Sequence, residues 1–191
     1  MPSNLKAGVA LQTCGVVMCF LAIAAMYQRI SHSLDLRENP PPGQLVDVGG
    51  YRMHIHCTGQ GSPTVILDSG LADSSLSWFK VQPEIARFTR VCSYDRAGLG
   101  WSDESRYPRE SKVFVEELHT LLRKAGINPP LILVGHSMGG FDVLLYADRY
   151  RDEVKGMILV DSAYPDLANR LPKLKTSLSE WRKGLEREEY V

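Results

Sequence analysis

The sequence has no excess of either charge, few cysteines, and no histidine after position 136. Lysine plus arginine number 22, as do aspartate plus glutamate, and no basic patch is interleaved with aromatic residues, so nucleic acid is not an expected partner. The four cysteines are too few, and wrongly spaced, for a zinc knuckle or a disulfide scaffold. Since no metal-ligand pattern is present either, we expect neither a metal nor a cofactor.

What remains is ordinary for a globular protein, with 44% apolar and 23% charged residues. The N-terminus is the exception, because Ala7–Tyr27 carries no charge. A run of about 20 apolar residues can cross a bilayer as a helix. We therefore expect residues 1–30 to be a transmembrane anchor or a signal segment, and the protein to be membrane-anchored by a single pass or exported.

An uncleaved anchor is favoured over a signal peptide, because the apolar run is longer than a usual signal core, although Ala22–Ala24 fits a cleavage pattern. A buried helix of the soluble domain is disfavoured, because the segment is apolar on all faces. Residues 31–43 are polar and end in Pro40–Gly43, which predicts a proline-rich linker that does not continue the helix. The folded domain is expected from Gln44.

Strands and helices are predicted to alternate along this domain, which assigns it to the α/β class. The later strands are continuous apolar runs, as in a mostly parallel sheet covered by helices on both faces. The expected strands are 44–48 and 51–57 (a hairpin), 64–68, 90–95, 130–134 and 154–160, and the expected helices are 76–88, 113–125 and 141–150.

One motif carries chemistry. Gly135-His136-Ser137-Met138-Gly139 is a G-x-S-x-G placed directly after a predicted strand and before a predicted helix. This context is typical of a nucleophile elbow, in which a sharp turn lifts the serine hydroxyl clear of the sheet. A plain glycine-rich turn with a buried serine is the alternative. A phosphate-binding loop is the least favoured interpretation of this motif, because the Gly-Lys-Ser/Thr ending of such loops is absent.

Three motifs, in order, resemble the α/β-hydrolase superfamily: LDSGLADSSLSW (67–78), YDRAGLGWSD (94–103) and GHSMGG (135–140). The resemblance covers roughly residues 44–165, an N-terminal portion of that fold. It implies that Ser137 is the nucleophile, and that the backbone N–H groups of Met138 and Leu71 form the oxyanion hole. In many relatives the loop before the second donor reads His-Gly, whereas here it reads Ser69-Gly70.

The resemblance implies a small-molecule ester or amide substrate and an acyl-enzyme intermediate. A serine at the elbow argues against haloalkane dehalogenases and epoxide hydrolases, whose nucleophile is aspartate. Esterase, lipase, peptidase, thioesterase and perhydrolase activities all stay open. Asp68 and Ser69 are expected to order their loop, and Asp95 and Arg96 to brace the neighbouring turn.

A serine needs a base, and in this superfamily an acid and then a histidine follow the serine along the chain. Here none of the five histidines follows Ser137. His54 and His56 suit a half-exposed strand face, His119 the exposed side of a helix, and His136 a packing role. Truncation after the sixth strand would explain the missing base, with residues 166–191 the start of a cap or helical region.

Asp161, at the end of the last expected strand, is a candidate acid, and hydrogen bonding at the strand end is its other role. The superfamily also places the strands of Cys57 and Cys92 side by side, so an exported domain could oxidise this pair. The alternative to a serine hydrolase is a non-catalytic, membrane-tethered binding module on a hydrolase-derived fold, which would leave the last strand as an exposed edge.

Overall fold

The computed structural model describes residues 2–162, and the chain divides into two compact units, Met1–Pro41 and a second that begins at Pro42. The first unit contains a single helix, α1 (Pro2–Glu38). The predicted linker was therefore wrong at its start, because the helix continues through most of residues 31–43. The helix ends just before the proline run, whose residues lack amide donors and restrict the residue before them.

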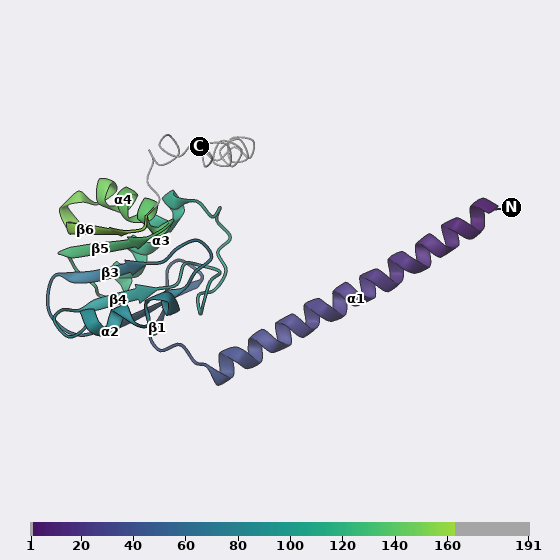
Figure 1. Cartoon of the computed structure of the whole chain (residues 1–191), viewed down its shortest axis with the longest axis horizontal. Coiled ribbons are helices and arrows are strands. Elements are labelled where there is room, and N and C mark those ends of the chain that lie inside the picture. The colour runs from purple at the N-terminus through teal and green to yellow at the C-terminus, as the bar shows by residue number, and fades with distance from the viewer. Residues whose placement is uncertain (1, 163–191) are drawn as a thin grey trace. The chain divides into compact units, whose positions relative to one another are not determined.

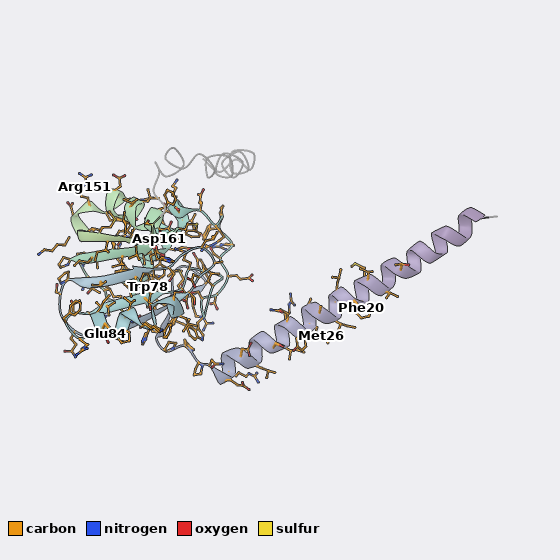
Figure 2. All side chains as sticks on the ribbon, viewed as in Figure 1. Phe20, Met26, Trp78, Glu84, Arg151 and Asp161 are labelled. Atoms are coloured by element: carbon orange, nitrogen blue, oxygen red, sulfur yellow. A yellow bond between two sulfur atoms is a disulfide. The ribbon has the colours of Figure 1, made fainter. Side chains whose placement is uncertain are left out.

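The apolar side chains described on α1 are exposed within that unit, and Figure 2 shows Phe20 and Met26 projecting from the helix. Among the residues whose side chains are described, no helix is both long and apolar enough to cross a membrane. The transmembrane anchor expected at residues 1–30 is therefore not confirmed.

The second unit is built on a six-stranded sheet in the order β1-β2-β4-β3-β5-β6, and Figure 1 shows β6 at one edge with β5, β3 and β4 following. The strands are β1 (Gln44–Asp47), β2 (Arg52–Thr58), β3 (Thr64–Asp68), β4 (Val91–Tyr94), β5 (Leu131–His136) and β6 (Val154–Val160). The pairs β4–β3, β3–β5 and β5–β6 are parallel, whereas β1–β2 and β2–β4 are antiparallel. The predicted mostly parallel sheet is confirmed.

Two apolar layers hold the sheet, because alternate side chains of its buried strands point to opposite faces. On one face Ile66 of β3 joins a core with residues of α3 (Ser111–Lys124) and α4 (Gly139–Arg149). On the other face Val65 packs with Trp78 and Ile85. Every residue of β3 and β4 is buried, which explains why the middle of β3, residues 65–67, is a continuous apolar run.

The helix predicted over 76–88 is two shorter pieces, a 3₁₀ turn (Ser75–Trp78) and α2 (Val81–Ile85). Pro83 accounts for the break, because in the interior of a longer helix its ring would clash with the carbonyl of the residue four positions earlier. In the first turn of α2 the missing N–H of Pro83 costs nothing, because that donor has no partner inside the helix.

The parallel strands β3, β5 and β6 all end on the same side of the sheet, at their carboxyl ends. Asp68 at the end of β3 lies opposite Gly135 of β5, and His136 lies opposite Val160 of β6. Loops that leave these strands therefore start side by side, which in open parallel sheets is where ligands bind. The elbow and the loop after β3 both leave from this side of the sheet.

The structure contains the disulfide that the sequence suggested. Cys57 of β2 and Cys92 of β4 are direct cross-strand partners, with Cα atoms 4.1 Å apart, and their sulfur atoms are bonded. The bond joins the antiparallel hairpin to the parallel part of the sheet.

Candidate active site

Ser137 lies where β5 turns into α4, in the strand–turn–helix setting that the elbow motif predicts. Its φ is +50°, a left-handed conformation that a residue with a Cβ adopts at a cost. Three hydrogen bonds hold this turn. The Ser137 N–H donates to the Val160 carbonyl over 3.2 Å, and the Ser137 carbonyl accepts from Gly140 N–H (3.1 Å) and Ser162 Oγ (3.3 Å). The strained turn is therefore tied to β6 and to its own helix.

The loop after β3 lies directly against the elbow. A Cβ added at Gly139 would come within 2.6 Å of the Asp68 and Ser69 carbonyl oxygens, so only glycine permits this approach. At Gly70 the added atom would lie 3.4 Å from Ser137 Cβ. The residue that follows, Leu71, is therefore next to the candidate nucleophile.

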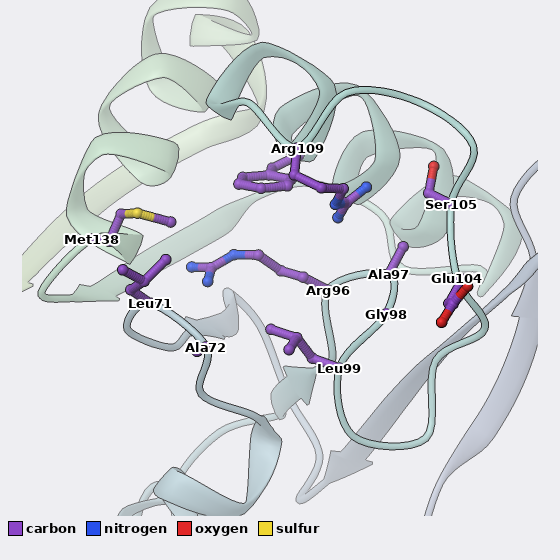
Figure 3. A pocket seen from close by; sticks show the side chains of 11 residues that line it. Leu71, Ala72, Arg96, Ala97, Gly98, Leu99, Glu104, Ser105, Arg109 and Met138 are labelled. Atoms are coloured by element: carbon purple, nitrogen blue, oxygen red, sulfur yellow. The ribbon is translucent and has the colours of Figure 1, made fainter. Parts of the chain in front are cut away.

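Leu71 and Met138, the two expected oxyanion-hole residues, meet at one end of a cavity of about 380 Å³, where Figure 3 shows their side chains side by side. Within the described residues, no backbone carbonyl accepts a hydrogen bond from either residue's N–H. Two free amides beside the elbow are what an oxyanion hole needs. The structure brings Ser137, Met138 and Leu71 together as the sequence predicts.

Arg96 is the most heavily contacted polar side chain near this site, and it is 4% exposed. Nη1 donates to the Gly70 carbonyl over 2.9 Å, and Nη2 donates to the Ser69 carbonyl and to Asp68 Oδ1. Nε lies 3.2 Å from Asp142 Oδ2 of α4. We expected Arg96 to brace the neighbouring turn, and the structure shows that its side chain holds the loop after β3.

The buried Arg96 guanidinium faces two buried carboxyl groups, those of Asp68 and Asp142. Its single positive charge can balance only one carboxylate, so the other carboxyl group is expected to keep its proton. Burial raises the pKa of Asp142 to about 7, and the Asp68 charge adds to the rise, whereas Arg96, Ser111 and Arg109 lower this pKa. Burial also raises the pKa of Asp68. Arg96 Nη2 donates a hydrogen bond to Asp68, which favours the ionised form of that carboxyl group. We therefore assign the proton to the carboxyl group of Asp142.

The cavity beside the two amides is mostly apolar, with Ala97, Leu99 and Phe114 among its lining residues. Arg109 enters from the loop before α3, and Figure 3 shows its side chain above that of Arg96. The guanidinium of Arg109 is paired with Glu117 (2.9 Å) and lies 4.5 Å from the centroid of the Phe114 ring. Its charge is therefore largely compensated by the protein.

Asp161 follows β6 directly, is exposed, and has φ +42° (Figure 2). Its neighbours on both sides, Val160 and Ser162, make the hydrogen bonds to the Ser137 backbone described above. Asp161 therefore lies on the strand end that adjoins the elbow.

The interpretation of His54 as half-exposed was wrong, because the side chain is fully buried and its Nδ1 lies 2.9 Å from Asp95 Oδ2. Asp95 also accepts hydrogen bonds from the N–H groups of Ser75 and Trp101. Sequence periodicity missed this pair, because β2 has a neighbour on each side and the glycine-rich loop after β4 covers it.

The prediction that His119 lies on the exposed side of a helix was also wrong. Its ring stacks on Tyr150 with centroids 3.9 Å apart, and Nε2 lies 3.1 Å from Glu153 Oε1. His136 packs edge-on near Trp78, with centroids 6.4 Å apart, in line with a packing role. In residues 44–162, no histidine makes a hydrogen bond to the Ser137 hydroxyl.

Asp142 is the site residue that the sequence reasoning missed. The available signal was an acidic residue next to Phe141 in the first turn of a helix that otherwise presents apolar residues to the sheet. In the part of the chain that the structure describes, no three histidine, cysteine, aspartate or glutamate side chains are grouped to hold a metal ion. The 166–191 region, expected to begin a cap, lies outside the described residues.

Comparison with known proteins agrees with this geometry. The sequence profile of the alpha/beta hydrolase fold family matches residues 63–185. The uncharacterized protein YqjL of Bacillus subtilis is 34% identical over 123 residues, which cover 64% of this chain and 49% of that protein.

Among solved structures, a bromoperoxidase from Bacillus anthracis has a TM-score of 0.57 and 28% identity, covering 62% of this chain and 44% of its own. A meta-cleavage product hydrolase from Pseudomonas fluorescens has a TM-score of 0.58 and 26% identity, covering 63% and 45%. The chain thus spans half or less of the length of these relatives. By its sequence match and its six-stranded sheet, the chain belongs to the α/β-hydrolase fold family.

Proposed function

We propose that Ser137 is the nucleophile of a serine hydrolase that cleaves an ester or amide bond of a small molecule through an acyl-enzyme. The observation that carries the proposal is the juxtaposition of a strained Ser137, at φ +50°, with the unpaired amides of Leu71 and Met138. Backbone strain of this kind persists where the surrounding structure enforces it, which is common at reacting groups.

In the proposed reaction a base takes the Ser137 proton as Oγ attacks the carbonyl carbon, the alcohol or amine then leaves with that proton, and water hydrolyses the acyl-enzyme. In the attack step the carbonyl oxygen becomes an oxyanion. The two free N–H groups stabilise this charge, and the positive end of α4, which begins at Gly139, adds to the effect. The cavity next to the two amides, largely apolar in lining, accommodates the part of the substrate attached to the carbonyl.

The base in this proposal is a histidine, and none of the histidines in residues 44–162 makes a hydrogen bond to the Ser137 hydroxyl. Asp161 is the candidate acid, because it follows the strand end that is bonded to the elbow. A non-catalytic binding module is not favoured, because solved structures that share the fold are enzymes by name.

Acylation with an activated p-nitrophenyl ester tests the proposal. After incubation of the folded chain with imidazole present as a base, peptide mass spectrometry should find an acyl group on Ser137 and none there in Ser137→Ala. Ser77→Ala, which removes an exposed serine, is the control and should be acylated like the unmodified chain. Equal acylation of Ser137→Ala, or no acyl group on Ser137 in a folded preparation, would contradict the proposal.

We propose further that the protein is exported or membrane-anchored, as the sequence predicts. The Cys57–Cys92 disulfide supports this location, because disulfides persist in oxidising compartments and are rare in the cytosol. Fractionation of producing cells should place the oxidised chain outside the cytosol or in the membrane. Recovery of the folded chain in the cytosolic fraction with both thiols reduced would contradict it.

A further inference from the structure

The two halves of the candidate oxyanion hole come from different elements. Leu71 follows β3, whereas Met138 precedes the first turn of α4. The hole works only if both N–H groups point at one oxygen, since donors are effective within about 3 Å of the oxyanion position. Close packing at Gly139 brings loop and helix together, but contact alone does not fix the direction of an amide.

Arg96 supplies directed contacts to this loop. Two of its nitrogens donate to the carbonyls of Ser69 and Gly70, the two carbonyl groups that precede the Leu71 N–H along the chain. Since the Gly70 carbonyl and the Leu71 N–H belong to the same planar peptide, a donor that fixes the carbonyl also fixes the opposite direction of the N–H. The guanidinium thereby sets where the Leu71 donor points.

Asp142 connects the same guanidinium to the other half of the hole. Its Oδ2 lies 3.2 Å from Arg96 Nε, and it belongs to the first turn of α4, the helix that begins directly after Met138. Both side chains are almost fully buried, with 4% and 1% of their surfaces exposed, so water screens the pair little. The cation therefore contacts the loop with its Nη atoms and the helix with its Nε.

We propose that Arg96 is the positioning residue of the oxyanion hole, fixing the Leu71 amide through the Ser69 and Gly70 carbonyls and anchored to the Met138 helix by Asp142. The inference rests on the proposed function and adds the residues that align its two donors. Lysine cannot replace Arg96 here, because one ammonium lacks the planar fork that serves both carbonyls and both carboxylates.

Hydrogen exchange of the folded full chain tests the alignment without any need for activity. In Arg96→Lys, amides 69–73 should exchange about 10-fold faster or more, while those of β3 and β5 stay protected. At a pH above 7, where Asp142 is ionised, Asp142→Asn keeps the shape and removes the charge, and it should loosen the same loop to a smaller extent. Arg52→Lys, at the exposed pair with Asp103, is the control and should leave the loop unchanged.

The second readout is the rate of phosphonylation of Ser137 by a fluorophosphonate probe. Arg96→Lys should lower the maximal labelling rate by about 10-fold or more, with the half-saturating probe concentration little changed, because the hole acts on the transition state. Unchanged loop exchange and labelling in folded Arg96→Lys and Asp142→Asn would overturn the proposal. If the unmodified chain is not labelled even with imidazole present, the proposed function fails, and the exchange comparison still decides whether Arg96 positions the loop.

Discussion

The backbone N–H of Ser137 donates a hydrogen bond to the carbonyl oxygen of Val160 over 3.2 Å. The turn that carries the candidate nucleophile is thereby fixed to β6, the edge strand of the described sheet. On β6, Met157, Ile158, Leu159 and Val160 are between 37% and 54% exposed. A long apolar edge with free backbone groups is a template for pairing with another chain.

Self-association through β6 should therefore respond to a charge on that strand. We expect Ile158→Glu to reduce association of the detergent-solubilised chain at least several-fold, because a carboxylate resists burial between paired sheets. Analytical ultracentrifugation measures the change. Phe88→Glu, which replaces an exposed apolar residue before β4, is the matched control. If the two substitutions reduced self-association equally, β6 would not be the surface through which the chains associate.

Asp95 should be one of the residues that stability depends on most. It accepts hydrogen bonds from buried His54 and from the N–H groups of Ser75 and Trp101. Burial raises the pKa of Asp95, but these hydrogen bonds bring it below its ordinary value. Asp95→Ala removes the acceptor of all three of these hydrogen bonds, so we expect a loss of about 3 kcal/mol or more in urea unfolding.

The control for Asp95 is Asp103→Ala, which breaks an exposed pair with Arg52. It should cost less than about 1 kcal/mol, because solvent screens that pair. A similar loss in both variants would contradict the structural role given to the His54–Asp95 pair.

Asp142 should make stability fall as the pH rises. A carboxyl whose pKa rises on folding, here from 3.8 to about 7, stabilises the fold while protonated. This contribution is complete below pH 3.8 and is lost as the pH approaches 7, and its full size is at most about 4 kcal/mol. The rise in the pKa of Asp68 acts in the same direction.

Asp142→Asn removes this titration, so the unfolding free energy of the variant relative to the unmodified chain should increase between pH 5 and pH 8. Urea unfolding at the two pH values measures the difference. Asp148→Asn, at an exposed position on the same helix, should show no such change. A constant difference between Asp142→Asn and the unmodified chain would show that Asp142 is ionised throughout this range.

The Cys57–Cys92 bond should stabilise the sheet by closing a loop between cysteines separated by 35 positions. Loop-closure entropy for that length corresponds to about 4 kcal/mol. Cys57→Ser with Cys92→Ser should therefore unfold at lower urea concentration, and the unmodified chain under reducing conditions should behave alike. Alkylation of both thiols in the folded, unreduced protein would show that the bond does not form.

The sequence alone predicts the sheet and the elbow well, because both depend on local signals. Continuous apolar runs mark β3 and β5, and the glycines around Ser137 mark the turn after β5. It does not predict the Arg96–Asp142 pair or the burial of His54, since these depend on segments that meet only in the folded chain. The broken helix at Pro83 could have been read from the sequence, because proline restricts helix interiors.

Labelling of Ser137 in the presence of imidazole, added as a base, tests the proposed nucleophile most directly. The folded chain should be labelled slowly by a fluorophosphonate, and added imidazole, which can take the serine proton, should accelerate labelling of Ser137 by about 10-fold or more. Peptide mapping locates the label, and Ser137→Ala should abolish it. Imidazole-dependent labelling at Ser137 would establish a nucleophile and an assembled oxyanion hole that lack only a base. A folded chain that stays unlabelled at Ser137 in imidazole would contradict the account.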